Sequence, residues 1–126
     1  MANELILVVE DNPKNLKLVR DILQVKGYRT IEAGTGEEGV QLSREQHPAL
    51  VLMDIQLPGI SGVEALQQLR ADPVTSAVPV IAITASVMPQ DQKRIMAAGF
   101  DGFQGKPISV RELLETVRQI LDKSAQ

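Results

Sequence analysis

The sequence of 126 residues contains no cysteine, which excludes a disulfide framework and a thiolate metal site. Its one histidine, His47, precedes Pro48 and is expected at a helix end or in a loop. Zinc is therefore disfavoured, because zinc sites usually combine several nitrogen or sulfur ligands. The formal net charge is −3 and the sequence has no basic run. Direct binding to nucleic acid is disfavoured as well, because it normally requires a clustered basic footprint.

Long hydrophobic runs are also absent. No apolar stretch approaches the ~20 residues that span a bilayer, and the amino terminus lacks the charged-then-apolar pattern of a signal peptide. We therefore expect a cytoplasmic protein without membrane contact. The length suits one domain, and 44% apolar residues suffice for its core. Residues 1–126 are expected to form that single domain, which leaves no room for an output domain.

Short apolar runs predict the strands. Three runs are almost entirely apolar, which is typical of parallel strands buried on both faces: Leu5–Val9, Ala49–Met53 and Val78–Ile83. Two weaker segments, Tyr28–Glu32 and Gly102–Gln104, are predicted to be edge strands.

Helix signals fill the intervals between these runs. They comprise Asn12 as an N-cap before Pro13, a stop at Gly27, capping boxes at Ser61/Glu64 and Ser109/Glu112, and a helix from Pro89 to Gly99. Strands and helices thus alternate in five pairs. This order predicts an α/β sandwich with a parallel sheet and right-handed crossovers.

Polar residues follow the predicted strands. Glu10 and Asp11 come after the first buried run, Asp54 after the second, Thr84 after the third, and Lys106 after the weak fifth strand. Each alone has an ordinary explanation as a helix cap, a strand end or a turn. Together they are harder to dismiss, because the carboxyl ends of parallel strands meet at one edge, where such sheets bind ligands.

The chemistry of this edge can be inferred from its charges. Three converging carboxylates repel one another, and at least one pKa should rise unless a cation intervenes. Mg²⁺ is the natural cation for oxygen ligands. A metal, an ammonium and a hydroxyl around Asp54 would cradle phosphoryl oxygens, and the central carboxylate would be the nucleophile that forms an acyl phosphate.

Four motifs contain these strand-end residues: Val9-Glu10-Asp11-Asn12, Leu52-Met53-Asp54-Ile55-Gln56-Leu57-Pro58, Ile83-Thr84-Ala85 and Gly105-Lys106-Pro107-Ile108. With these motifs at matching spacings, the sequence from about Leu5 to Leu121 resembles the receiver domain of bacterial response regulators. This resemblance implies a flavodoxin-like (βα)5 three-layer sandwich with strand order 2-1-3-4-5.

The resemblance also implies roles at the acidic edge. Asp54 would accept a phosphoryl group from a phosphohistidine. Asp11, Asp54 and the backbone carbonyl of Gln56 would hold Mg²⁺, with Mn²⁺ as an alternative, and Glu10 would help directly or through water. Lys106 would grip phosphoryl oxygens.

Thr84 would grip phosphoryl oxygens too, and would form a switch with Phe103, an aromatic residue that turns inward as Thr84 moves. Phenylalanine lacks the hydroxyl of a tyrosine at this place. The chain would be a signal-transducing phosphoacceptor that catalyses only its own phosphorylation and dephosphorylation. The implied partners are a histidine kinase or histidine phosphotransferase and a downstream protein. The implied state is a monomer that can dimerise on phosphorylation.

Two further features refine this resemblance. Ala85–Met88 and Pro107–Ser109 look like the single-domain cell-cycle receivers and like the receivers of hybrid kinases. A proline directly after a site lysine also favours a cis peptide between Lys106 and Pro107, since cis is cheap only before proline.

Three rival interpretations are weaker. Residues 34–39 fit the G-x-G-x-x-G dinucleotide fingerprint, but they follow an edge-like strand, and Glu37 and Glu38 would sit where pyrophosphate must bind. An aspartate-based phosphohydrolase would need a second acidic residue where Gln56 stands, and glutamine cannot act as a general acid. A degenerate receiver, which binds partners without phosphorylation, would lack a site residue, and none is missing.

Overall fold

The computed structural model describes residues 3–85 and 88–124. Strands and helices alternate strictly along this part of the chain, as predicted. Their bounds are β1 (Leu5–Val9), α1 (Pro13–Val25), β2 (Arg29–Ala33), α2 (Gly36–Gln46), β3 (Leu50–Asp54), α3 (Gly62–Ala71), β4 (Val80–Thr84), α4 (Pro89–Ala98), β5 (Gly102–Gly105) and α5 (Val110–Ser124). Ser86 and Val87, part of the Ala85–Met88 motif, lie outside the described residues.

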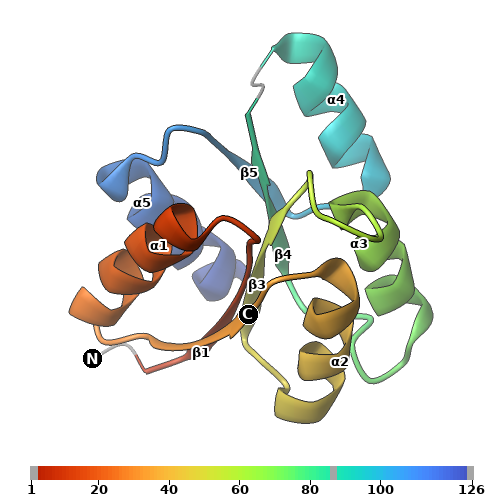
Figure 1. Ribbon diagram of the computed structural model, residues 1–126, viewed down its shortest axis with the longest axis horizontal. Helices are drawn as coiled ribbons and strands as arrows, with labels where there is room; N and C mark the ends of the chain where they lie inside the picture. Colours follow the sequence, from red (N-terminus) through yellow and green to blue (C-terminus); the bar gives the residue numbers. More distant parts are fainter. Residues whose placement is uncertain (1–2, 86–87, 125–126) are drawn as a thin grey trace.

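The strands form one parallel sheet in the order β2-β1-β3-β4-β5, so the predicted order and the two predicted edge strands are confirmed. Figure 1 shows α1 and α5 on one face of this sheet and α2, α3 and α4 on the other. The result is the three-layer α/β sandwich of the flavodoxin-like fold.

Side chains of the central strands point alternately into two hydrophobic cores. In β1, Ile6 and Val8 belong to the core under α1 and α5, whereas Leu7 and Val9 belong to the core under α2, α3 and α4. All four are fully buried. Burial on both faces explains why these strands are continuous apolar runs.

Side-chain caps fix the starts of several helices near the carboxyl edge of the sheet. The Asn12 side chain accepts two backbone N–H groups of the first turn of α1. Ser61 and Glu64 form the predicted capping box of α3. At α5, the backbone N–H of Glu112 donates to Ser109 Oγ at 3.4 Å, which is one half of the other predicted box.

The glycine-rich segment 34–39 has a structural role. Thr35 caps α2 by accepting the N–H of Glu38, and the Glu38 carboxylate accepts the N–H of the first glycine of the segment at 2.8 Å. An acidic side chain therefore lies at this helix start, where a dinucleotide would place its pyrophosphate. A Cβ on Gly39 would lie 2.7 Å from Val9 Cγ2, so this glycine lets α2 pack closely against the sheet.

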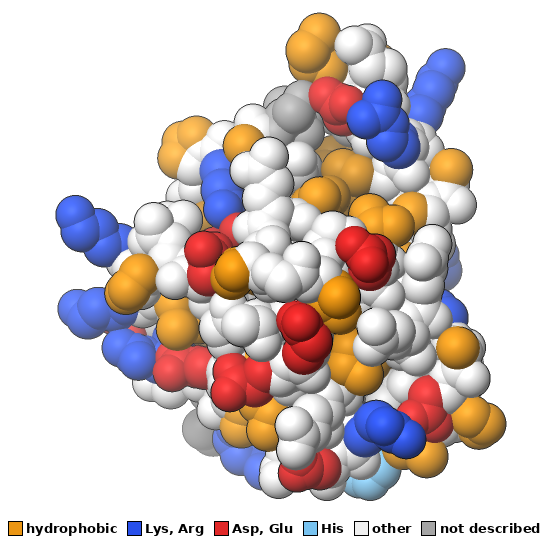
Figure 2. Space-filling model, turned by 45° about the vertical axis from the view of Figure 1, so that its right-hand side comes forward, with side chains coloured by type: hydrophobic (Ala, Val, Ile, Leu, Met, Phe, Trp, Pro, Cys, Tyr) orange, Lys and Arg blue, Asp and Glu red, His pale blue; other side chains and the backbone are white. Residues whose placement is uncertain are grey.

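The surface carries charges of both signs. Figure 2 shows acidic and basic side chains interspersed over the face turned to the viewer. This distribution differs from the clustered basic footprint with which proteins contact nucleic-acid backbones. Within the described residues, no helix is long and apolar enough to cross a membrane.

Candidate functional site at the carboxyl edge of the sheet

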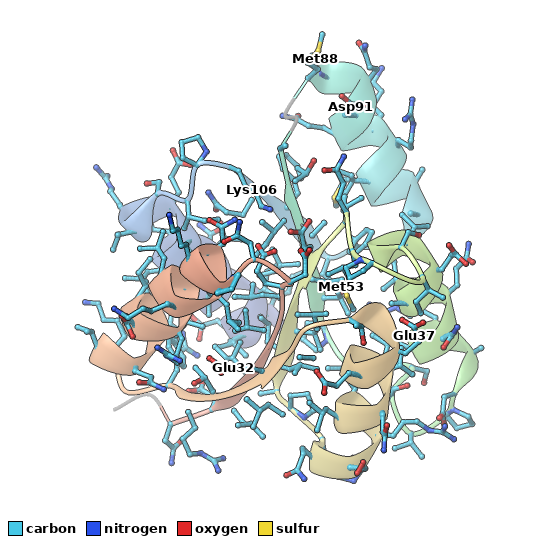
Figure 3. All side chains as sticks on the ribbon, in the orientation of Figure 1. Glu32, Glu37, Met53, Met88, Asp91 and Lys106 are labelled. Atoms are coloured by element: carbon cyan, nitrogen blue, oxygen red, sulfur yellow. The ribbon has the colours of Figure 1, made fainter. Side chains whose placement is uncertain are left out.

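The polar residues predicted at the strand ends lie at one edge of the sheet. Asp54 and Thr84 are the last residues of β3 and β4, Glu10 and Asp11 follow β1, and Lys106 follows β5. The backbone N–H of Lys106 donates to the Thr84 carbonyl at 2.8 Å, which ties the last strand end to its neighbour. Figure 3 shows Lys106 at the same end of the sheet as the first turn of α1.

Asp54 is a buried carboxylate with a donor on each oxygen. Only 2% of the residue is exposed. Lys106 Nζ lies 2.7 Å from Oδ2, and the backbone N–H of Gln56 donates to Oδ1 at 2.9 Å. These two contacts fix the orientation of the carboxylate. The Gln56 contact is not predicted from the sequence, although an aspartate at the start of a loop often binds the backbone two residues further on.

Glu10 shares the same ammonium group. Its Oε1 lies 3.4 Å from Lys106 Nζ, and its Oε2 accepts the backbone N–H of Asn12 at 3.2 Å. Burial, together with the neighbouring Asp54 carboxylate, raises the pKa of Glu10 from 4.5 to about 7. Burial alone would lower the pKa of Lys106, but its hydrogen bond to Asp54 and the charge of Asp54 outweigh burial and raise it. Lys106 thus faces two carboxylates, whose combined negative charge exceeds the single positive charge of its ammonium group.

The acidic side chains can serve together as metal ligands. Glu10, Asp11 and Asp54 each offer a carboxylate oxygen, and these oxygens lie within 4.8 Å of one another. Asp11 is exposed, whereas the other two are buried. Oxygen donors of this kind are those that Mg²⁺ prefers, and a divalent cation would offset the repulsion among these carboxylates. The donor set therefore fits a magnesium ion.

Thr84 and Phe103 lie on the same face of the sheet. Thr84 lines a groove of about 330 Å³ together with Gln56 and with Ile95 of α4. Phe103 is partly buried against the core on the α4 side. The register of β4 and β5 pairs Phe103 with Ala82, two residues before Thr84. The side chains of Thr84 and Phe103 are therefore diagonal neighbours on this face, close enough for one to respond to the other.

The connection from β5 to α5 contains a cis peptide bond between Lys106 and Pro107, which confirms the prediction from the sequence. Proline is the residue before which a cis bond is least unfavourable.

A flavodoxin-like sheet of order 2-1-3-4-5 with a buried, lysine-paired aspartate at its carboxyl edge defines the class of CheY-like signalling domains. The sequence profile of the response regulator receiver domain matches residues 6–118, and the chain belongs to this family. The chain is 45% identical to the polar-differentiation response regulator DivK of Brucella ovis over 116 aligned residues. The alignment covers 92% of this chain and 94% of the relative.

Solved structures agree with this assignment. The receiver domain of a sensor histidine kinase from Pseudomonas aeruginosa is 31% identical, with a TM-score of 0.88 over 95% of this chain and 98% of that chain. That structure has a magnesium ion coordinated in its active-site cleft. A CheY-like receiver domain protein from Methanospirillum hungatei is 29% identical, with a TM-score of 0.85 over 98% and 97% of the two chains.

Family membership establishes the general role of the chain. It is a phosphoaccepting receiver domain of two-component signal transduction, homologous to the DivK single-domain cell-cycle receivers that the Ala85–Met88 and Pro107–Ser109 segments resemble.

Proposed function

We propose that Asp54 is the phosphoacceptor and takes its phosphoryl group from the phosphohistidine of a histidine kinase or histidine phosphotransferase. A carboxylate oxygen of Asp54 attacks phosphorus, the nitrogen–phosphorus bond breaks, and the imidazole leaves as an acyl phosphate forms. The observation that carries this proposal is the environment of Asp54. It is a buried carboxylate, oriented by Lys106 and by the Gln56 amide inside an acidic cluster.

The reaction is proposed to depend on Mg²⁺. Asp11, Asp54 and the backbone carbonyl of Gln56 would hold the ion, and Glu10 would contact it directly or through water. Mn²⁺ would suit the same oxygen donors. A bound divalent cation neutralises charge on the transferring phosphoryl group. The magnesium ion in the Pseudomonas relative supports this proposal.

Two further side chains are proposed to act on the phosphoryl group. Lys106, which pairs with Asp54 before the reaction, would then contact a phosphoryl oxygen. Thr84 would contact another, and its movement would let Phe103 turn inward. Their shared face supports a switch that is read out near α4 and β5.

Residues 1–126 are proposed to work as one receiver domain in the cytoplasm. The domain would catalyse only its own phosphorylation and dephosphorylation. It would pass the signal to a downstream protein through a changed surface, as a monomer that can dimerise once phosphorylated. The mixed charges on the face shown in Figure 2 favour a protein partner over nucleic acid on that face.

Intact mass measurement tests the proposed function. The protein is incubated with a small phosphodonor, with Mg²⁺ or with chelator, beside the variant Asp54→Asn. We expect the mass of one phosphoryl group on the wild type with Mg²⁺ and none on Asp54→Asn. Phosphorylation of Asp54→Asn at the wild-type rate would refute the assignment.

A further inference from the structure

Gly62 lies directly against the backbone of the proposed phosphoacceptor. It is the first residue of α3, and Figure 1 shows how loop 55–61 rises beyond the end of β3 before the chain enters this helix. A Cβ on Gly62 would lie 2.5 Å from the Asp54 carbonyl oxygen and 2.8 Å from Ile55 Cα. Real Cβ atoms essentially never come within 3.0 Å of a heavy atom that lies outside their own and the adjoining residues. The helix can therefore approach Asp54 this closely only because residue 62 has no side chain.

The need for glycine here is one of space. Gly62 does not have the positive φ found at Gly59 and Gly99, so alanine could adopt its backbone conformation. Alanine is also the better helix former. The close contact with the Asp54–Ile55 backbone therefore stands against alanine at position 62, whereas backbone conformation and helix propensity do not.

Hydrogen bonds connect Gly62 to the geometry of the site. Its N–H donates to the Ile55 carbonyl at 3.0 Å, and the Ile55 N–H donates to the Ile83 carbonyl at 3.0 Å. The Ile55 backbone is thus held between α3 and β4. Gln56, the next residue, donates its N–H to Asp54 Oδ1. The carboxylate of Asp54 and the Gln56 backbone therefore both depend on the position of Ile55.

We propose that Gly62 is a positioning residue for the Asp54 carboxylate and for the metal ligands beside it, an inference that rests on the proposed function of Asp54. A side chain at position 62 has to push α3 and the Asp54–Ile55 backbone apart by at least roughly half an ångström. Backbone atoms in a central strand cannot rotate away from the contact. The displacement therefore reaches the nucleophile, for which a shift of about 1 Å can slow a reaction ~100-fold.

Gly36 supplies a matched control. Like Gly62, it is the buried first residue of a helix and follows a Ser or Thr cap. A Cβ on Gly36 would lie 2.8 Å from Ile60 Cγ1, a side-chain atom that can move, and 3.2 Å from the Ile60 carbonyl oxygen, a milder backbone contact than the 2.5 Å at Gly62. Leu69, fully buried near the other end of α3, supplies a control for loss of stability, because Leu69→Ala removes core contacts far from the site.

The experiment compares Gly62→Ala, Gly36→Ala and Leu69→Ala. Mg²⁺ affinity is measured by calorimetry, and phosphorylation by a small donor is measured by intact mass. We expect Gly62→Ala to bind Mg²⁺ at least about fivefold more weakly and to be phosphorylated about 10- to 100-fold more slowly. Both control variants should stay within about twofold of the wild type. Wild-type behaviour of Gly62→Ala, or an equal defect in Leu69→Ala, would overturn the proposal.

Amide spectra give a readout that needs neither metal nor phosphorylation. In Gly62→Ala the Gln56 amide resonance should shift, whereas in Gly36→Ala it should stay near its wild-type position. In the wild type, the Gly62 amide should exchange with solvent more slowly than that of Val63 in the same turn, because it is bonded to Ile55. If Gly62→Ala fails to fold, this exchange decides the matter, and fast exchange at Gly62 overturns the proposal. If the wild type is phosphorylated at a residue other than Asp54, the proposed function fails. The shift of the Gln56 amide resonance in Gly62→Ala still tests whether Gly62 positions the backbone beside Asp54.

Discussion

Lys106 and Asp54 form an ion pair with a nitrogen–oxygen distance of 2.7 Å, in which 25% of the lysine side chain and 3% of the aspartate side chain are exposed. The pair joins the loop after β5 to the end of β3, so it forms only when the sheet is assembled. Breaking such a pair leaves an uncompensated buried charge, which costs more than the pair itself contributes.

Lys106→Met keeps the apolar stem of the side chain and removes its charge. We expect three effects: unfolding becomes easier by about 1–3 kcal/mol at pH 8, Mg²⁺ binds more tightly because a competing cation is gone, and phosphorylation slows. Denaturant unfolding, calorimetry and mass measurement follow each effect. Lys17→Met, which removes an exposed lysine paired with Asp21, is the control. Weaker Mg²⁺ binding by Lys106→Met would contradict this account.

Glu10 should make the stability of the metal-free protein depend on pH. Its pKa is about 7 in the folded protein and ordinarily 4.5, so the folded state holds the proton more tightly. The resulting stabilisation is complete below pH 4.5 and is lost as the pH rises through 7, on the order of 3 kcal/mol in all. Between pH 4.5 and 7, the unfolding free energy of Glu10→Gln should vary less with pH than that of the wild type. Glu45→Gln, on the exposed face of α2, should keep the pH dependence of the wild type.

Mg²⁺ affinity should rise with pH, whereas the stability of the metal-free protein falls. A carboxylate must lose its proton before it binds the ion, so affinity rises up to about pH 7 and each binding event releases protons. Calorimetry in buffers of different ionisation enthalpy counts these protons. Affinity that is constant from pH 5.5 to 8 would argue against a role for Glu10.

Asp11→Asn tests the third carboxylate. Asp11 is exposed and close to two other acids, so its charge attracts a cation but repels its neighbours when the site is empty. We expect Mg²⁺ affinity to fall at least about tenfold, a loss of ~1.4 kcal/mol. The metal-free protein should be as stable as the wild type or more so. Asp21→Asn on α1 is the control, and tight Mg²⁺ binding by Asp11→Asn would be inconsistent with its proposed role.

Thr84 and Phe103 should respond together to a phosphoryl mimic. When beryllofluoride binds with Mg²⁺, we expect the amide resonances of Phe103 and of Ile95 in α4 to shift. Thr84→Ala should still accept a phosphoryl group on Asp54 but should lose most of that shift, and Thr84→Ser should restore it by returning the hydroxyl. An unchanged Phe103 amide in the wild type would count against the switch.

Local patterns predict the strands well, and their errors have a physical reason. The Leu5–Val9 run coincides with β1, but the other two buried runs end at Met53 and Ile83 while β3 and β4 extend to Asp54 and Thr84. These two residues are polar, yet their backbones still pair with the neighbouring strands. A strand ends where backbone pairing ends, which the hydropathy of its side chains does not record.

Contacts between separate elements of the fold lie beyond such patterns. The close approach of Gly62 to Asp54 depends on how α3 enters the domain. Arg118 of α5 donates to Glu4 and to the Tyr28 hydroxyl, across 114 and 90 residues of sequence. No local spacing predicts these three contacts, because they follow from how the helices pack on the finished sheet.

The alternation of side chains along the strands also assigns Asp54 and Thr84 to opposite faces of the sheet. Asp54 continues the row of Leu52, which packs under α1 and α5, whereas Thr84 continues the row of Ala82, which packs under α2, α3 and α4. A charge added at Asp54 would thus enter from one layer and reach the other through Thr84 at the rim of the sheet. If Asp54 and Thr84 act as proposed, the sheet separates the helix layer on the side of the phosphoryl group from the layer in which the change is read out.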